Sequence, residues 1–474
     1  MSLILKNSIL KLGCSNLLRV LPTRYARFNS TLSFKRNDSD LKISKLSNGM
    51  RVATMKFGID NIPNSLTFGL WVDSGSRNED PGKNGIAHFL EHLIFKGTYN
   101  RSRKDIESQI EDLGAHLNAY TTREQTVYQI RCFNQDLTNC MDLLSDIIKN
   151  SKFCKSAIEQ EKRVVLREME EVSKSEEEII FDDLHREMYK DHPLGNTILG
   201  PKENILGFKR EDLINYIRTN YIPEKMMILG VGNIDHSSFK SIAETYFGNA
   251  SNKSRNIIGF NGNNNVNLST SQCLNGINSF KNHPVLVHKK NNSDGKTLLA
   301  MAYNGTSWNS KDFLKVMFLQ SMLGEYGTNN INRVTGYKNQ IIERILSGIK
   351  DHVEFFETFN TCYKDTGLFG WYLKSNCDLS RKAIMENAKL ISSRFKNLDS
   401  LITEDDIIRV KRILSYQLTS LYENSGTLFE EVGRDLIVNN HYISIDDKLK
   451  QIQKIDLDGI KEIIHKYFNF NPFY

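Results

Sequence analysis

Residues 86–97 read Ile-Ala-His-Phe-Leu-Glu-His-Leu-Ile-Phe-Lys-Gly and hold the most informative pattern in the chain. The apolar residues recur at helical spacing, and Gly97 is placed to end a helix predicted over Ile86–Phe95. At about 100° per residue, His88, Glu91 and His92 fall on one face of that helix. Two imidazoles four residues apart can bind one tetrahedral Zn²⁺, and the carboxylate beside them can reach a water molecule. The alternative is a plain surface helix that carries two histidines and an acid.

A catalytic zinc site needs a further protein ligand, and a glutamate on a second helix is a common one. The helix predicted over residues 155–172 offers five candidates: Glu159, Glu161, Glu168, Glu170 and Glu171. Glu161 and Glu168 are seven residues apart and share a face with Val165, so this face is expected to be buried. Two carboxylates on a buried face are costly unless they bind a cation or a charged partner.

Around these helices, the pattern of strands and helices occurs twice. In residues 41–248 we predict strands at 66–72, 117–132 (a pair) and 226–231. In residues 284–474 we predict strands at 297–303 and 368–373 and helices at 311–323, 380–396 and 404–421. Between the two lies a stretch, 249–283, that is rich in Asn and poor in apolar residues, as a linker would be. The chain is therefore expected to contain two similar α+β halves.

The charge of the chain is concentrated at its start. The chain has 62 basic and 56 acidic residues, a net charge of +6, and residues 1–37 contain seven of the basic residues and no acid. A basic, acid-free, amphipathic start is typical of a mitochondrial transit peptide, which we place at residues 1–29; a retained basic arm is the alternative. Without residues 1–29 the balance is 57 basic against 56 acidic, or +1. We therefore expect no nucleic-acid partner.

Two further features limit the class of protein. Seven cysteines without a Cys-x-x-Cys motif fit reduced thiols better than a disulfide framework. No stretch reaches the roughly 18 apolar residues that a membrane-spanning helix needs, so none is expected.

The motif helix and its surroundings resemble the M16 (pitrilysin-like) metallopeptidases over roughly residues 43–470. The similar segments are 88–98 (HFLEHLIFKGT), 114–128 (GAHLNAYTTREQTVY), 164–169 (VVLREM), 192–195 (HPLG), 199–201 (LGP) and 365–370 (DTGLFG). This resemblance implies two α/β-sandwich halves with mainly antiparallel sheets, and one Zn²⁺ per chain.

The resemblance also implies roles for the site residues. His88, His92 and Glu168, in the Arg-Glu-Met segment, become the metal ligands. Glu91 becomes the catalytic base, and Glu161 becomes an accompanying acid of the catalytic machinery. The second half has no His-x-x-Glu-His motif and is expected to be catalytically silent.

Within the family, the similarity is to members that cut basic presequences from proteins imported into mitochondria. The acidic run at residues 176–183 complements such a substrate. On a helix Glu178 and Asp182 are four residues apart, so the two carboxylates could flank one guanidinium. The alternative is a solvated acidic face. The strand that contains Asn118 and Ala119 is expected to pair with an extended substrate through its main chain.

The resemblance further predicts partners and location. The glycine-rich loop of the α-type subunit is absent, since Gly324–Gly327 is too short and polar. The chain is therefore expected to be a β-type subunit that needs an α-subunit and acts in the mitochondrial matrix. The alternative is a scaffold subunit of the cytochrome bc1 complex, alone or in addition to peptidase activity.

Overall fold

A computed structural model describes residues 40–57, 65–248, 283–290, 294–327 and 339–468. The predicted leader, residues 1–29, and the Asn-rich stretch 249–282 lie outside the described residues. The first half is built on a six-stranded sheet in the order β1-β2-β6-β3-β5-β4. Its strands are β1 (Leu41–Lys45), β2 (Arg51–Lys56), β3 (Ser65–Val72), β4 (His116–Thr121), β5 (Thr126–Phe133) and β6 (Met226–Gly232). Only the β2–β6 pair among these neighbours is parallel.

Helices of the first half cover the outer face of this sheet. They are α2 (Ile86–Leu93), α3 (Arg103–Asp112), α4 (Leu137–Asn150), α5 (Lys155–Val172), α7 (Lys202–Gly207), α8 (Arg210–Asn220) and α9 (His236–Phe247). Buried side chains from β3 and β5, such as Phe68 and Ile130, form one apolar core with Phe89, Leu144 and Phe239 of these helices. The burial of that apolar surface is the main force holding the layer to the sheet.

The second half repeats the arrangement with a five-stranded antiparallel sheet in the order β7-β8-β11-β10-β9. The strands are β7 (Val285–Lys290), β8 (Thr297–Asn304), β9 (Glu325–Gly327), β10 (Val353–Cys362) and β11 (Gly367–Ser375). The helices are α10 (Phe313–Leu323), α11 (Gln340–Ile345), α12 (Arg381–Lys396), α13 (Glu404–Ser420), α15 (Ile445–Gln453) and α16 (Leu457–Phe468). Trp371 and Phe395 are fully buried between these layers.

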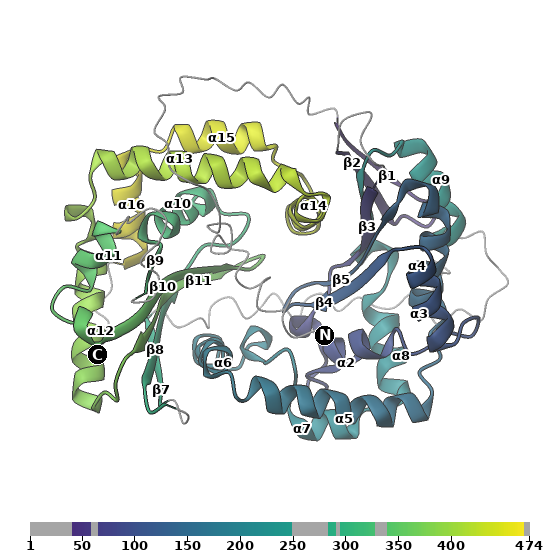
Figure 1. Ribbon diagram of the computed structural model, residues 1–474, viewed down its shortest axis with the longest axis horizontal. Coiled ribbons are helices and arrows are strands. Elements are labelled where there is room, and N and C mark those ends of the chain that lie inside the picture. Colours follow the sequence, from purple (N-terminus) through teal and green to yellow (C-terminus); the bar gives the residue numbers. More distant parts are fainter. Residues whose placement is uncertain (1–39, 58–64, 249–282, 291–293, 328–338, 469–474) are drawn as a thin grey trace.

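One helix of each half packs against the sheet of the other half (Figure 1). Helix α6 (Glu176–Met188) follows α5 in the first half but packs Ile180 and Leu184 against Leu298 and Ala300 of β8. Helix α14 (Ser425–Asn439) follows α13 in the second half but packs against β3 and β6 of the first sheet. Each sheet is therefore buried on both faces, and neither half can bury its sheet without the other.

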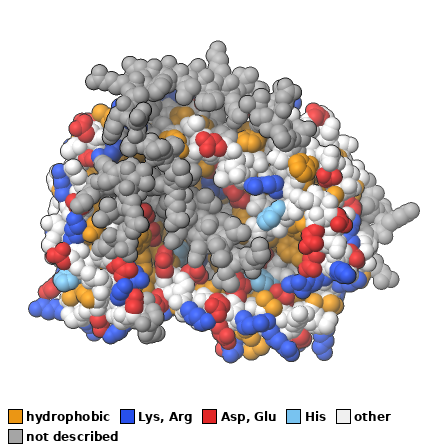
Figure 2. Space-filling view, in the orientation of Figure 1, with side chains coloured by type: hydrophobic (Ala, Val, Ile, Leu, Met, Phe, Trp, Pro, Cys, Tyr) orange, Lys and Arg blue, Asp and Glu red, His pale blue; other side chains and the backbone are white. Residues whose placement is uncertain are grey.

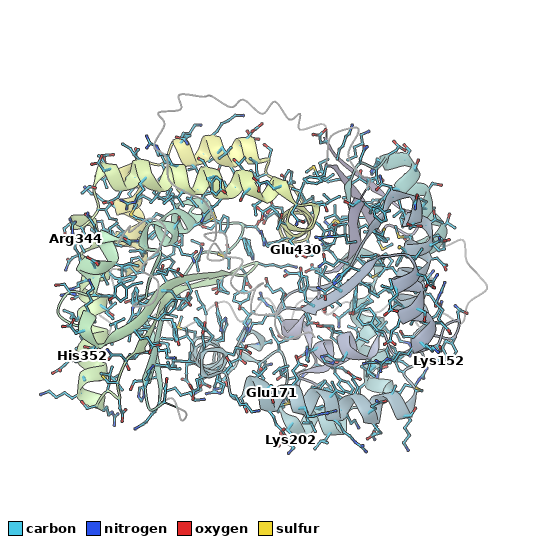
Figure 3. All side chains as sticks on the ribbon, viewed as in Figure 1. Lys152, Glu171, Lys202, Arg344, His352 and Glu430 are labelled. Atoms are coloured by element: carbon cyan, nitrogen blue, oxygen red, sulfur yellow. The ribbon has the colours of Figure 1, made fainter. Side chains whose placement is uncertain are left out.

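Helix α14 approaches the first sheet closely because it has a glycine at the contact. A Cβ added at Gly433 would lie 2.1 Å from an atom of the Trp71 ring on β3, far inside van der Waals contact. Glu430, labelled in Figure 3, lies on the same helix and accepts a hydrogen bond from Tyr120 of β4. Polar and apolar contacts thus join the second half to β4.

These findings confirm the predicted α+β class, with two α/β halves and mainly antiparallel sheets. The exchange of α6 and α14 was not predicted. Basic and acidic side chains are intermixed along the lower edge of the molecule (Figure 2). Among the described helices, none is both long and apolar enough to cross a membrane.

Candidate metal centre

Helices α2 and α5 lie against each other beneath the first sheet and bring the predicted ligands together. Helix α2 is buried on almost every side, and Ala87, Phe89, Leu90 and Leu93 fix it in the core. Helix α5 buries Ile158 and Val165 on the side that also carries Glu161 and Glu168. The face of α5 predicted to be buried is therefore the face that meets α2.

The three predicted metal ligands converge. One side-chain ligand atom from each of His88, His92 and Glu168 lies within 4.8 Å of the others. Glu168 Oε2 is 3.7 Å from His88 Nε2 and 3.0 Å from His92 Nε2. His88 is 1% exposed and Glu168 is 6% exposed, so water screens their charges weakly. These residues are 80 positions apart in the chain and meet only because the two helices pack.

Glu161 acts on the site through His92. Its Oε1 atom lies 3.0 Å from His92 Nδ1, and its Oε2 atom lies 3.0 Å from Lys96 Nζ. An ionised carboxylate can only accept a hydrogen bond, so His92 Nδ1 donates to Glu161, and Nε2 is the ring nitrogen that faces Glu168. Burial alone would raise the pKa of Glu161, but the hydrogen bonds from His92 and Lys96 lower it below its usual value. Glu161 is thus a carboxylate that orients the ring of His92, one of the predicted ligands.

The same contacts change the protonation of His92. Burial lowers its pKa, but hydrogen bonds to Glu161 and Glu168 and the nearby charge of Glu91 raise it more, to about 9. The position between His92 Nε2 and Glu168 Oε2 therefore favours a positive charge. A proton can supply that charge, and so can a metal cation.

The donor set fits Zn²⁺. Two imidazole nitrogens and one carboxylate oxygen are ligands that catalytic zinc takes, with a fourth position left for water or substrate. A carboxylate on the outer nitrogen of a histidine ligand, as Glu161 is on His92, is the usual support of such a site. We find one group of His, Cys, Asp and Glu side chains close enough to hold a metal within the part of the chain that the structure describes.

Glu91 lies on α2 next to the ligands. It is one residue before His92 and three after His88, and its side chain is 5% exposed. A carboxylate this close to a metal position can accept a proton from an attacking water and return it to a leaving group. The remaining acids weighed for the site point away from it, since Glu159, Glu170 and Glu171 are exposed on α5.

Strand β4, with half-buried Asn118 and Ala119, lies beside α2. Among the described strands β4 is paired with β5 alone, so it is an edge of the sheet. An edge strand has unpaired main-chain groups that an extended peptide can join. The corresponding strand of the second sheet, β10, is covered on its outer side by β9.

Glu178 and Asp182 lie on α6 as predicted, but Asp182 already has internal partners. Its Oδ1 atom accepts a hydrogen bond of 2.7 Å from Arg123, and its Oδ2 atom accepts one of 3.0 Å from Thr197. Arg123 is 5% exposed and also donates to the carbonyl of Leu194. Asp182 therefore neutralises a buried guanidinium of this chain, and a substrate guanidinium would have to share it.

Two residues of the site region escaped prediction. Lys96 holds Glu161, and the only indication in the sequence was its position four residues after His92 on the motif helix. Arg123 holds Asp182 across 59 residues of sequence, and no local pattern links a turn between two strands to a later helix. Both partners become visible only when the fold is known.

Comparisons with known proteins find a matching family and similar relatives. Residues 60–202 match the family described as insulinase, peptidase family M16, and residues 207–414 match the peptidase M16 inactive domain. The mitochondrial-processing peptidase subunit beta of Lentinula edodes is 35% identical over 434 residues, which cover 90% of this chain and 87% of that protein. The subunit of the same name from Mus musculus is 33% identical, covering 91% of this chain and 83% of that protein.

Solved structures with the same fold include a protease from Helicobacter pylori, at a TM-score of 0.74 and 19% identity, covering 90% of this chain and 96% of that chain. They also include a chain of Complex III2 from Candida albicans, at a TM-score of 0.68 and 17% identity, covering 90% of this chain and 93% of that chain. These structures show the same fold, and the family matches and the relatives above confirm the resemblance inferred from the motifs.

Proposed function

The chain belongs to peptidase family M16, and on that premise we propose that it is the catalytic β-type subunit of a zinc endopeptidase that cleaves presequences from proteins imported into mitochondria. The observation that carries this proposal is the convergence of His88, His92 and Glu168 beside Glu91. Relatives named mitochondrial-processing peptidase subunit beta, at 32–35% identity over about 90% of the chain, support the substrate class.

In the proposed mechanism His88 Nε2, His92 Nε2 and Glu168 would hold Zn²⁺. When bound, the ion supplies Lewis-acid chemistry to the carbonyl of the scissile peptide bond. Glu91 takes a proton from the water that attacks this carbonyl carbon. It then gives the proton to the amine nitrogen as the carbon–nitrogen bond breaks. Glu161 keeps the His92 ring oriented throughout, through the hydrogen bond at Nδ1.

The substrate would bind extended along β4, with main-chain hydrogen bonds near Asn118 and Ala119. Such bonds ignore side-chain identity, which suits presequences of varied sequence. Glu178 would attract a basic substrate residue, with Asp182 sharing its charge between Arg123 and the substrate. Because Asp182 also supports the fold, Glu178 is the better position at which to test selectivity.

We further propose an α-type partner subunit and action in the mitochondrial matrix, after removal of residues 1–29. The scaffold role in the cytochrome bc1 complex is not favoured, since the relatives above are named as peptidase subunits. The likeness to the Complex III2 chain, at 17% identity, extends to the fold alone.

The test is cleavage of a synthetic presequence by the purified chain, with and without an α-type subunit, together with the zinc content of the chain. We expect one zinc per chain and efficient cleavage only with the partner. A matched presequence with its arginine near the cut replaced by alanine should be cleaved more slowly, and a Glu178→Gln variant should reduce the difference between the two substrates. A zinc-free chain, or no cleavage in either condition, would contradict the proposal.

A further inference from the structure

Helix α2 carries both histidine ligands, yet its own sequence provides no cap for its start. Its N-cap residue is Gly85, with φ of 97°, and its first turn contains no acidic residue. The first N–H groups of any helix have no partner within the helix and need one from elsewhere. In a helix of eight residues the first turn is a large part of the whole.

Glu79 provides that partner from the preceding loop. It directly follows the short 3₁₀ helix η2 (Ser76–Asn78). Its Oε2 atom accepts hydrogen bonds of 2.9 Å from the N–H of Gly85 and 2.8 Å from the side chain of Asn84, and its Oε1 atom accepts one of 2.9 Å from the N–H of Ala87. A negative group at this end also interacts favourably with the helix dipole.

The surroundings of this contact are rigid. Gly85 lies against Gly200 so closely that a Cβ on either residue would come within 3 Å of the other's backbone. Asn84 also donates to the carbonyl of Thr197 and accepts at its own carbonyl from Asn204. Burial of the carboxylate raises the pKa of Glu79 to about 7, although the hydrogen bonds that it accepts from residues 84–87 lower it. The ionised form of Glu79 is therefore disfavoured by burial, yet the residue lies where its carboxylate contacts the start of α2.

His88 is the third residue of α2 and directly follows Ala87, whose N–H is bound by Glu79. The direction of the first turn therefore sets where the His88 ring lies relative to His92, one turn later. We propose that Glu79 is a positioning residue of the metal site, which fixes the first turn of α2 and with it the place of His88. This inference rests on the metal site in the proposed function.

The same segment is also tied to the second half of the molecule. Arg77, two residues before Glu79, donates to both carboxylate oxygens of Asp365 in the turn between β10 and β11. The N–H of Arg77 bonds the carbonyl of Arg123, in the turn that follows β4. Glu79 thus lies on a segment that is bonded both to the second half and to the turn after β4, as a positioning residue requires.

The test uses Glu79→Ala and Glu79→Gln in the full chain, with Asp406→Ala as the matched control. Asp406 caps α13 in the other half by accepting hydrogen bonds from Thr403, far along the chain from the site. Co²⁺ serves as the probe, because its absorption spectrum reports the geometry of its ligands. Amide hydrogen exchange at Gly85, Ala87 and His88 reports the first turn of α2 without any metal.

We expect Glu79→Ala to weaken Co²⁺ binding by about 10-fold or more, as loss of an outer support of a metal site does, and to change the spectrum at saturating Co²⁺. Glu79→Gln, which keeps one acceptor oxygen, should change both less. Amide exchange in α2 should quicken in Glu79→Ala. Asp406→Ala should leave the spectrum, the affinity and the α2 amides as in the wild type.

Unchanged exchange and an unchanged Co²⁺ spectrum in Glu79→Ala would overturn the inference, and so would an equal loss of affinity in Asp406→Ala. If the wild-type chain binds no Co²⁺, the proposed function fails instead, and faster exchange at Gly85 and Ala87 still supports the cap by Glu79.

Discussion

The two halves of the molecule share an order of strands and helices. They differ in the side chains that they bury where two of their helices pack against each other. In the first half β3 leads to α2, the hairpin β4–β5 follows, then α4 and α5, and then the exchanged helix α6. In the second half β8 leads to α10, followed by β10–β11, α12 and α13, and the exchanged helix α14. Both pairs, α2 with α5 and α10 with α13, are in contact. The halves are therefore comparable helix by helix.

The paired helices of the first half carry the predicted metal ligands, and those of the second half pack through apolar side chains. Helix α5 buries Glu161 and Glu168, whereas α13 buries residues such as Val410 and Leu414. Helix α10, which follows β8 as α2 follows β3, buries Val316, Phe318, Leu319 and Met322 and contains no histidine or acid. Apolar side chains suffice to hold such a pair of helices together, so the charged residues of the first half serve a purpose other than folding.

Loss of the metal is the largest effect by which the two halves should differ. Glu168→Gln removes the charge of a predicted ligand but keeps the size of the side chain and a hydrogen bond to His92. Zinc and cleavage should therefore be lost, while the stability of the metal-free fold at pH 9.5, where His92 is neutral, should change by about 1 kcal/mol or less. Leu414→Ala in α13 should instead cost about 2–5 kcal/mol of unfolding free energy and leave the zinc content of the folded protein unchanged. Metal analysis, cleavage rates and urea unfolding measure these effects. A large loss of metal-free stability in Glu168→Gln would break the comparison.

The pH dependence of the metal-free protein is the next largest expected effect. The pKa of His92 is about 9 in the fold, against about 6.5 in an unfolded chain. A raised pKa contributes stability that is complete below pH 6.5 and is lost as the pH rises through 9, in total about 3 kcal/mol. Denaturant unfolding of the metal-free chain between pH 6 and pH 9.5 should show this loss, and His92→Gln should abolish it. Zinc affinity should rise over the same range, because the ion replaces the proton. Flat stability between these pH values in the wild type would contradict the geometry at His92.

The residues of the site could be predicted from the sequence where they lie close together along the chain. His88, Glu91 and His92 lie within five residues, and helical geometry alone puts them on one face. The face shared with Val165 reduced the candidate ligands on α5 to Glu161 and Glu168. The family resemblance then selected Glu168. Strands β3, β4, β5, β6, β8 and β11 were predicted from local sequence patterns, whereas β1, β2, β7, β9 and β10 were not. The division into two halves came from the Asn-rich stretch between two similar patterns of strands and helices.

What could not be predicted depends on contacts between distant segments. Periodicity shows that α6 and α14 have an apolar face, but it does not show which sheet receives that face. Asp182 was predicted to bind substrate because its partner Arg123 lies 59 residues away, and no pattern near Asp182 indicates this contact. No sequence pattern indicated that Glu79 caps α2. A carboxylate in a loop can cap a later helix only if the chain between residues 79 and 85 turns back toward it.

Glu161→Gln is a smaller change that would sharpen the comparison within α5. Glutamine can still accept from His92 Nδ1, but it lacks the charge that stabilises the ring and the pair with Lys96. Zinc affinity, measured by competition with a chelator, should fall by about 10- to 100-fold, while zinc still binds at saturation. Glu170→Gln, on the exposed face of the same helix, is the control and should leave the affinity unchanged. Wild-type affinity in Glu161→Gln would remove its role in holding His92.

The smallest expected effect concerns the contact between the halves. Asp365→Asn removes the charge that pairs with Arg77 and should cost about 1–2 kcal/mol, with less loss at high salt. Asp378→Asn breaks an exposed pair with Lys290 inside the second half and should cost at most about 1 kcal/mol. Urea unfolding at low and high salt compares the two. Equal losses of unfolding free energy in the two variants would show that the Arg77–Asp365 pair stabilises the protein no more than an exposed ion pair does.

We propose that the first half of this chain, and not the second, carries the catalytic site, with Glu91 moving the proton. The cleavage rate of Glu91→Gln, assembled with the α-type subunit and shown by metal analysis to contain zinc, tests this proposal. We expect one zinc per chain, as in the wild type, and cleavage slower by about 10²- to 10⁴-fold. A zinc-loaded Glu91→Gln enzyme that cleaves presequences at the wild-type rate would contradict the claim.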